Sequence, residues 1–152
     1  FLDEPTAGVD PEARRRFWDL IDALVAAGTA VFVTTHYMDE AERCHRLAYI
    51  AYGKKLLDSP TAEIPKQIGL SAWRIAGRPL HEAQQMLEAD EAVDLVARFG
   101  AEIHVCSKDA ASLERAVRAV KETQPHVEIE RIEAGFEEIF IYLMSGSIDN
   151  FQ

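Results

Sequence analysis

The sequence has little of what marks secreted, membrane-spanning or nucleic-acid-binding chains. Its two cysteines, Cys44 and Cys106, cannot build a disulfide framework, so a reducing compartment is the simpler assumption. No apolar run approaches the roughly 18 residues needed to cross a bilayer. Basic residues number 16 against 26 acidic ones, a net charge of −10. This balance argues against nucleic acid as a partner, because binding to phosphates depends on Lys and Arg.

The chain also lacks an initiating methionine and a signal peptide. It begins with Phe1, and we therefore expect a piece of a longer protein. What it does have is ordinary globular composition, with 48% hydrophobic and 28% charged residues in 152 residues. That length suits one domain or two small ones.

Residues 1–60 alternate helix and strand patterns. Asp10-Pro11-Glu12 predicts a helix start, and Gly28 suits the end of that helix. The unbroken apolar run at 30–35 is typical of a strand buried on both faces of a parallel sheet. A short helix at about 38–44 and a hairpin around Gly53 follow. One apolar stripe at helical spacing comprises Phe17, Leu20, Ile21, Leu24 and Val25.

The second half of the chain has a different pattern. Residues 61–70 predict a linker helix, and residues 71–152 predict a smaller domain with 8 basic and 15 acidic side chains, a net charge of −7. Its elements follow the order βαββαβ, the ferredoxin-like arrangement. A final helix at about 136–144 is apolar on nearly every side, so we expect it to be buried on most sides, either in the core or against another domain or subunit. The predicted strands are 72–76, 93–98, 102–106 and 127–132, and the predicted helices between them are 79–89 and 109–123.

Two adjacent carboxylates and a distant histidine are placed to share one site. Asp3 and Glu4 end an apolar strand, and His36 ends the next predicted strand. The carboxyl ends of parallel strands meet at one edge of a sheet, where ligands bind. One carboxylate there can hold Mg²⁺ through its waters. The other can orient or deprotonate a water for in-line attack, while His36 can donate to a phosphoryl oxygen.

The same stretches carry a resemblance to a known family. Residues 1–10 and 34–42 together resemble the ATP-binding subunit of ABC transporters of the exporter or drug-resistance class. The resemblance implies an α/β fold in which residues 1–60 form part of a P-loop NTPase (RecA-like) parallel sheet. Residues 71–152 would then be the accessory α+β ferredoxin-like domain, and the stretch 136–140 is similar to the closing helix of that domain.

The resemblance also implies roles for individual residues. Asp3 would serve Mg²⁺, Glu4 would be the catalytic base, and His36 would be the switch histidine that senses the γ-phosphate of ATP. The D-loop, which would touch an opposing ATP-binding subunit, would consist of Ala7, Gly8, Val9 and Asp10. Val9 replaces the leucine more usual in that loop. The intact protein would use ATP and Mg²⁺, would power export through a membrane permease, and would lie at the cytoplasmic, inner face of the cell membrane.

Other motifs of this family are missing. The chain has no G-x-x-x-x-G-K-[ST] phosphate cradle, no glutamine loop and no LSGGQ-like signature. Hydrolysis of ATP needs the cradle and the Mg²⁺ clamp together. We therefore expect this chain alone neither to bind ATP tightly nor to hydrolyse it. Without the strands that would precede Phe1, apolar surface around 31–33 and on one face of the helix at 17–25 should be uncovered and favour self-association.

A second class of function stays open. Residues 71–152 could form a non-catalytic regulatory or dimerisation module that does the work, with the ATPase stretch as a passenger. Single residues also have structural readings: Asp10 is a good helix cap, and His36 alone is more often an ordinary polar residue. Cys44-His45 lacks partners at zinc-like spacing. The sequence upstream of Phe1 separates the two functional readings, because only the ATPase requires a phosphate cradle there.

Overall fold

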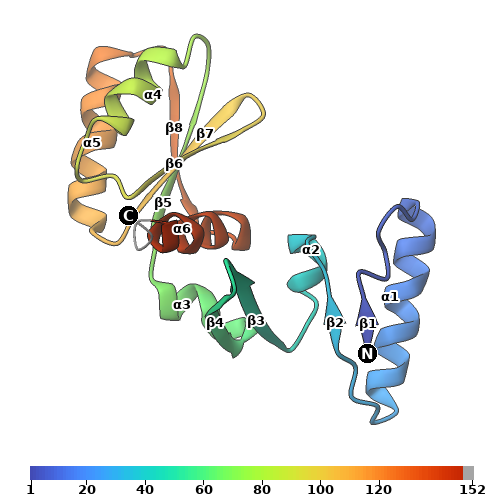
Figure 1. The fold of residues 1–152 in the computed structure, drawn as a ribbon. Coiled ribbons are helices and arrows are strands. Elements are labelled where there is room, and N and C mark those ends of the chain that lie inside the picture. Colours follow the sequence, from blue (N-terminus) through green and yellow to red (C-terminus); the bar gives the residue numbers. More distant parts are fainter. Residues whose placement is uncertain (149–152) are drawn as a thin grey trace. The chain divides into compact units, whose positions relative to one another are not determined.

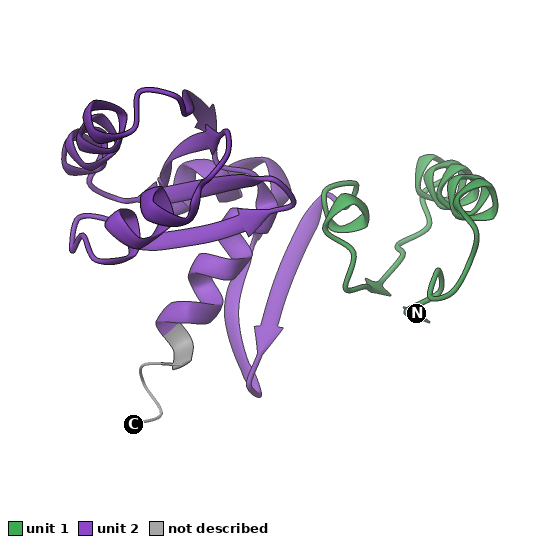
Figure 2. Ribbon diagram, turned by 90° about the horizontal axis from the view of Figure 1, so that it is seen from above, with its two compact units in different colours: residues 1–44 green, residues 45–152 purple. Residues whose placement is uncertain are grey.

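The computed structural model describes residues 1–148, which belong to two compact units (Figure 2). Unit 1 is residues 1–44 and unit 2 begins at His45. The elements of unit 1 are β1 (Leu2–Asp3), α1 (Pro11–Ala26), β2 (Val33–Thr34) and α2 (Met38–Ala41). Those of unit 2 are β3 (Arg46–Ala51), β4 (Lys54–Pro60), η1 (Thr61–Glu63), α3 (Ile64–Ile68), β5 (Ser71–Ala76), α4 (His81–Glu88), β6 (Leu95–Phe99), β7 (Glu102–Ser107), α5 (Ala110–Thr123), β8 (Glu128–Glu133) and α6 (Phe136–Ile148), as labelled in Figure 1.

The break between the units falls before the β3–β4 hairpin, whereas the sequence suggested a boundary at residue 60. Packing explains the difference. Tyr49 of β3 stacks on Phe140 of α6 with ring centroids 4.4 Å apart, and the Thr61 N–H donates to the His45 carbonyl at 3.0 Å. The hairpin therefore shares its core with the C-terminal elements.

Helix α1 begins and ends as its sequence predicts. The Asp10 side chain accepts hydrogen bonds from the N–H groups of Glu12 and Ala13, each at 3.0 Å, and Gly28 follows the helix at φ +90°. The buried face differs from the predicted stripe. Trp18 and Ile21 are buried, while Leu20 and Leu24, both in the stripe, are 59% and 40% exposed.

Strand β2 is shorter and more exposed than predicted. Only two residues of the apolar run at 30–35 form the strand, and Phe32 is 59% exposed, so the expectation of burial on both faces is wrong. Within residues 1–148, β2 pairs only with β1. The Phe32 ring lies 5.7 Å from the ring of Phe1, centroid to centroid, and Phe1 is itself exposed. The apolar surface predicted to be uncovered is therefore exposed.

Unit 2 contains a four-stranded antiparallel sheet in the order β6-β7-β5-β8. The elements follow one another as β5-α4-β6-β7-α5-β8, which is the predicted order. Side chains alternate between the two faces of the sheet because successive residues of a strand point in opposite directions. Ile75, Ile103 and Val105 face one core, and Ala72 and Cys106 face another.

Helices α4 and α5 lie side by side against the first of these faces (Figure 1). Ala83 and Leu87 of α4, which are four positions apart and therefore share one helix face, are buried. The Asp109 side chain caps α5 by accepting from two N–H groups. Four residues of α5 at helical spacing are buried, namely Leu113, Ala116, Val117 and Val120. This layer is the main hydrophobic core of unit 2.

Helix α6 covers the second face and is held there by a polar contact as well as by packing. Ile139 and Phe140 are buried, but Ile141 and Tyr142 are only partly buried, so the helix is not enclosed on every side. The Glu138 carboxylate lies 2.5 Å from His104 Nδ1 and also accepts from the Gly135 N–H at 2.8 Å. None of the helices within residues 1–148 has the length and apolar character that a membrane span requires.

The contact of Glu138 with His104 predicts how unit 2 responds to a substitution. Glu138→Ala removes the nearest partner of the partly buried His104 imidazole, which then keeps, among the described carboxylates, only Glu102 at 3.9 Å. It should lower the free energy of unfolding of unit 2 by about 1–3 kcal/mol. Labelling with 5-fluorotryptophan gives separate ¹⁹F NMR signals for Trp18 and Trp73, so the Trp73 signal reports unit 2 during urea unfolding.

The matched control is Glu137→Ala, a change at the neighbouring exposed residue. It should alter the free energy of unfolding by no more than about 0.5 kcal/mol. Equal, small effects of both substitutions would contradict the role given to Glu138.

Candidate functional site

The carboxyl ends of two parallel strands form the candidate site in unit 1. Strand β1 pairs in parallel with β2, so that Leu2 lies opposite Val33 and Asp3 opposite Thr34. The Glu4 N–H donates to the Thr34 carbonyl at 3.1 Å. Because both strands run in the same direction, the residues that follow them lie at one edge.

Glu4 and His36 face each other at this edge. The Oε1 atom of Glu4 lies 3.5 Å from Nδ1 of His36, and the two side chains are 53% and 56% exposed. An exposed pair of this kind contributes little to stability. The His36 ring also lies against Tyr37, with centroids 4.2 Å apart. The pair is thus accessible to solvent. The stacking of His36 on Tyr37 contributes to its orientation, because the attraction between two exposed side chains is weak.

Asp3 is turned to a different partner. Its carboxylate accepts a hydrogen bond from the hydroxyl of Thr34, and that same hydroxyl oxygen accepts from the Glu4 N–H at 3.0 Å. Thr34 therefore links the side chain of one acid to the backbone of the other. The sequence placed both acids at this edge but gave no role to Thr34.

The backbone at Glu4 is strained. Glu4 has φ +42°, a left-handed conformation that costs a non-glycine residue roughly 1–3 kcal/mol. Two hydrogen bonds hold it there: its N–H donates to Thr34, and its carbonyl accepts from the Ala7 N–H at 3.1 Å. Strain of this kind persists where the surroundings impose it, and it often accompanies a functional group.

The segment after Glu4 is an exposed turn that leads into α1. Ala7 and Gly8 are exposed, and Gly8 adopts φ +71°, which glycine alone accepts without strain. The Val9 N–H donates to the Thr6 carbonyl at 3.1 Å, and Asp10 caps α1. The cap role of Asp10 is thus confirmed, and the turn before it is accessible to another chain.

The described residues fit a metal ion only through a single carboxylate. No group of three or more His, Cys, Asp or Glu side chains within residues 1–148 is arranged to enclose a metal. Mg²⁺ does not need one, because it keeps several of its waters and uses one or two carboxylates together with substrate phosphates. Asp3, which is exposed at the strand end, fits that requirement.

Glu40 is a buried residue next to the site, and the sequence pattern did not predict a role for it. Its side chain is buried, with 1% exposed, and it accepts from the Thr35 hydroxyl at 2.7 Å. Arg14 of α1 approaches the same carboxylate at 3.5 Å and stacks over the Tyr37 ring at 4.1 Å. Because Thr35 precedes His36, this network fixes the backbone that carries the histidine.

Burial and hydrogen bonding act in opposite directions on Glu40. Burial acts to raise the pKa of its carboxyl. The groups that counteract burial are the hydroxyls of Thr6 and Thr35, the indole of Trp18 and the guanidinium of Arg14, and together they hold the pKa below its ordinary value. Glu40 is therefore a charged, buried anchor for the loops that follow β1 and β2. The one signal in the sequence was an acid four residues after His36 on a short polar helix.

Comparisons with known proteins bear on what this edge does. No protein-family model matches the chain. The daunorubicin/doxorubicin resistance ATP-binding protein DrrA of Streptomyces peucetius is 35% identical over 161 aligned positions, which cover 99% of this chain and 47% of DrrA. This chain is related to the ATP-binding proteins of ABC transporters.

Further ABC transporter relatives match over a shorter stretch. The Nod factor export ATP-binding protein I of Paraburkholderia xenovorans is 45% identical over 78 residues, or 50% of this chain and 26% of the relative. The protein of the same name from Burkholderia pseudomallei gives the same values. The resemblance to ABC transporter ATP-binding subunits drawn from the sequence is thus confirmed. The chain spans about half the length of DrrA and about a quarter of the Nod factor proteins.

The Glu40 network predicts how acid and substitution affect unit 1. Because the folded pKa is lowered, ionised Glu40 stabilises unit 1 fully above the ordinary pKa of 4.5, and this stabilisation is lost as the pH falls through the lower folded pKa. Glu40→Ala should lower the free energy of unfolding of unit 1 by about 3 kcal/mol at neutral pH, since it leaves the partly buried Arg14 with only the exposed Asp39, at 3.9 Å, among the described carboxylates. The ¹⁹F signal of fluorinated Trp18 in urea reports this unit.

Asp39→Ala is the control, because the Asp39 side chain is 72% exposed and lies 3.9 Å from the same arginine. Its effect should stay within about 0.5 kcal/mol. If Glu40→Ala left the urea midpoint of Trp18 unchanged, the anchoring role would be refuted.

Proposed function

We propose that this chain is the end of the nucleotide-binding domain of an ABC transporter subunit, together with the accessory domain that follows it. The observation that carries the proposal is the meeting of Glu4 and His36, 3.5 Å apart, at the carboxyl edge of two parallel strands, with Asp3 beside them. In this proposal residues 1–60 belong to the nucleotide-binding domain, with β1 and β2 in its P-loop NTPase sheet and the β3–β4 hairpin as a separate antiparallel sheet that packs on α6. Residues 61–70 are the linker, and residues 71–152 are a ferredoxin-like domain. The sheet order β6-β7-β5-β8 supports the last assignment.

Asp3 and Glu4 would divide the work at the nucleotide. Asp3 would hold Mg²⁺ through water, and Mg²⁺ supplies charge neutralisation at the phosphates of ATP. The hydrogen bond from Thr34 orients the Asp3 carboxylate without covering it. Glu4 would accept the proton of the attacking water, and its carboxylate lies 3.5 Å from His36 Nδ1.

His36 would complete the edge by donating a hydrogen bond to the terminal phosphoryl oxygen. The imidazole nitrogen that is not turned to Glu4, Nε2, is the one available for such a contact. Glu4 beside Nδ1 then orients the ring, as a carboxylate does for many functional histidines. This role requires no large change in the arrangement of the two side chains.

The exposed turn after Glu4 would contact a second ATP-binding subunit. Ala7, Gly8, Val9 and Asp10 would act as the D-loop of an ATP-dependent dimer. Because Asp10 also caps α1, a movement of this turn would be transmitted directly to the helix. The exposed apolar residues of unit 1, Phe32 among them, would be covered by other parts of the same domain in the complete subunit, and would favour self-association of the chain alone.

The chain alone would not be an ATPase. It contains no phosphate cradle, and phosphoryl transfer depends on the cradle and the metal clamp together. In the complete protein, the ATP-binding subunit would lie in the cytoplasm at the inner face of the cell membrane and power export through a permease. The names of the relatives, which refer to drug resistance and to export, support this assignment.

Substitution of Glu4 in the complete subunit tests the proposal. Glu4→Gln keeps the size of the side chain but removes the base, and ATP hydrolysis should fall by roughly 10²–10⁴-fold. Binding of ATP, measured by equilibrium dialysis, should stay within about twofold, because the contacts of Glu4 are made with the attacking water. Steady-state phosphate release measures the hydrolysis.

The control is Asp19→Asn, which removes an exposed carboxylate on α1 and should leave both ATP binding and hydrolysis unchanged. A Glu4→Gln subunit that hydrolyses ATP at the rate of the unsubstituted subunit would refute the role of Glu4. The non-catalytic regulatory reading would then be favoured.

A further inference from the structure

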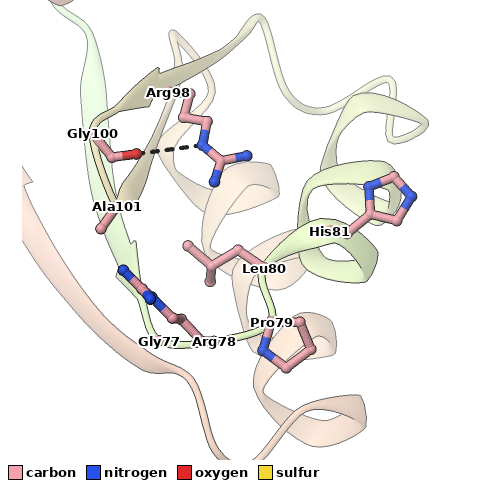
Figure 3. Close-up of a pocket in the computed structure, with 8 residues that line it drawn as sticks. All are labelled: Gly77, Arg78, Pro79, Leu80, His81, Arg98, Gly100 and Ala101. Atoms are coloured by element: carbon pink, nitrogen blue, oxygen red, sulfur yellow. Dashed lines mark hydrogen bonds between the residues drawn. The ribbon is translucent and has the colours of Figure 1, made fainter.

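A cavity in unit 2, far along the chain from Glu4 and His36, is lined by positively charged side chains although the protein as a whole is acidic. It has a volume of about 820 Å³ and lies between the β5–α4 loop and the β6–β7 turn (Figure 3). Its lining includes Arg78, His81 and Arg98, and among the described residues no carboxylate lines it. The protein as a whole has a net charge of −10, so this local excess of positive charge is unusual for the molecule.

Two arginines of this cavity have no carboxylate partner. Within residues 1–148, six of the eleven arginines form ion pairs. Of the other five, Arg78 and Arg98 line the same cavity. The only hydrogen bond of Arg98 in the described residues is from Nε to the Gly100 carbonyl at 3.4 Å, which leaves its terminal nitrogens available. Both guanidinium groups are therefore open to an anion that enters the cavity, and an anion would supply the charged partner that each of them lacks.

The cavity is built by backbone rather than by filling side chains. Gly77 adopts φ +134°, a conformation that favours glycine, and a Cβ atom there would lie 3.3 Å from the Cα of Val127, the residue before β8. On the opposite wall Gly100, at φ +59°, forms the β6–β7 turn. Leu80 is 6% exposed and lies between the two arginines (Figure 3). An apolar floor flanked by two guanidinium groups suits a small ligand with one anionic end.

We infer that this cavity binds a small molecule through a phosphate group. Arginine guanidinium groups pair with phosphate through two parallel hydrogen bonds, and the volume matches that of small-molecule sites. We expect a small ligand and not a nucleic acid, because the acidic surface of unit 2 would repel an extended polyanion. The inference does not depend on the role proposed for unit 1, since Arg78 and Arg98 belong to unit 2.

Titration of the 152-residue chain with pyrophosphate tests this inference by ¹H–¹⁵N NMR at about 150 mM salt. We expect saturable shifts at residues 77–81 and 98–101. Arg78→Ala and Arg98→Ala should each weaken binding at least tenfold, because each removes a charge-assisted pair of hydrogen bonds. These arginines are exposed or at a turn, so the variants should stay folded, which their spectra show directly.

Arg131→Ala is the matched control, because Arg131 also has no carboxylate partner within residues 1–148 but lines another cavity. Its affinity for pyrophosphate should stay within about twofold. Shifts that never saturate, shifts confined to residues outside the cavity, or an equal loss in the Arg131 variant would overturn the inference.

A sedimentation assay with vesicles that contain phosphatidic acid identifies the source of the phosphate. Arg78-dependent binding of pyrophosphate without sedimentation supports a free metabolite, and sedimentation that Arg78→Ala abolishes supports a lipid headgroup at the same cavity. Sedimentation that persists in Arg78→Ala would count against the cavity as the binding site. None of these outcomes affects the test of Glu4, which is made on ATP hydrolysis.

Discussion

The site in unit 1 depends on one short parallel pairing, that of β1 with β2. It involves only two residue pairs, Leu2 with Val33 and Asp3 with Thr34. Because the strands run in the same direction, Glu4 and His36 emerge at the same edge although they are 32 positions apart in the sequence. An antiparallel pairing would place them at opposite ends. Two residue pairs are too few to fix this geometry alone, so the threonines and Glu40 behind the strands are part of the site.

The two units differ in how much apolar surface they bury. Unit 2 has a sheet with both faces covered, by α4 and α5 on one side and by α6 on the other, and its buried side chains form continuous cores. Unit 1 has few buried apolar residues, chiefly Trp18, Ile21 and Ala41. The hydrogen bonds and the ion pair of Glu40 with Thr35 and Arg14 therefore contribute more to the stability of unit 1 than polar contacts usually do. This fits the proposal that the rest of its sheet belongs to other parts of the complete subunit.

The sequence predicted the helices and strands better than it predicted which of their residues are buried. Helix limits followed from local chemistry, such as Asp10 as cap, and the apolar pattern of residues 71–152 predicted the order of strands and helices in unit 2. Burial could not be predicted in this way, because it depends on what lies beyond a strand: the run around Phe32 looks like a buried strand but has one neighbour. For the candidate site, the spacing predicted that the acids and His36 lie at one edge, and Glu4 and His36 do lie there. Glu40 was missed because a short polar helix normally indicates solvent. The cavity between Arg78 and Arg98 was missed because these residues come from different elements.

The most direct test of this account is a nuclear Overhauser measurement on the isotope-labelled chain in solution. The account predicts cross-peaks between the imidazole ring of His36 and the side-chain methylene protons of Glu4, whose polar atoms lie 3.5 Å apart, alongside backbone cross-peaks that pair Asp3 with Thr34. If the backbone pairing were present while the His36 ring showed contacts only to other residues, the edge would not bring base and histidine together, and the assignment of this chain to ATP hydrolysis would lose its structural basis.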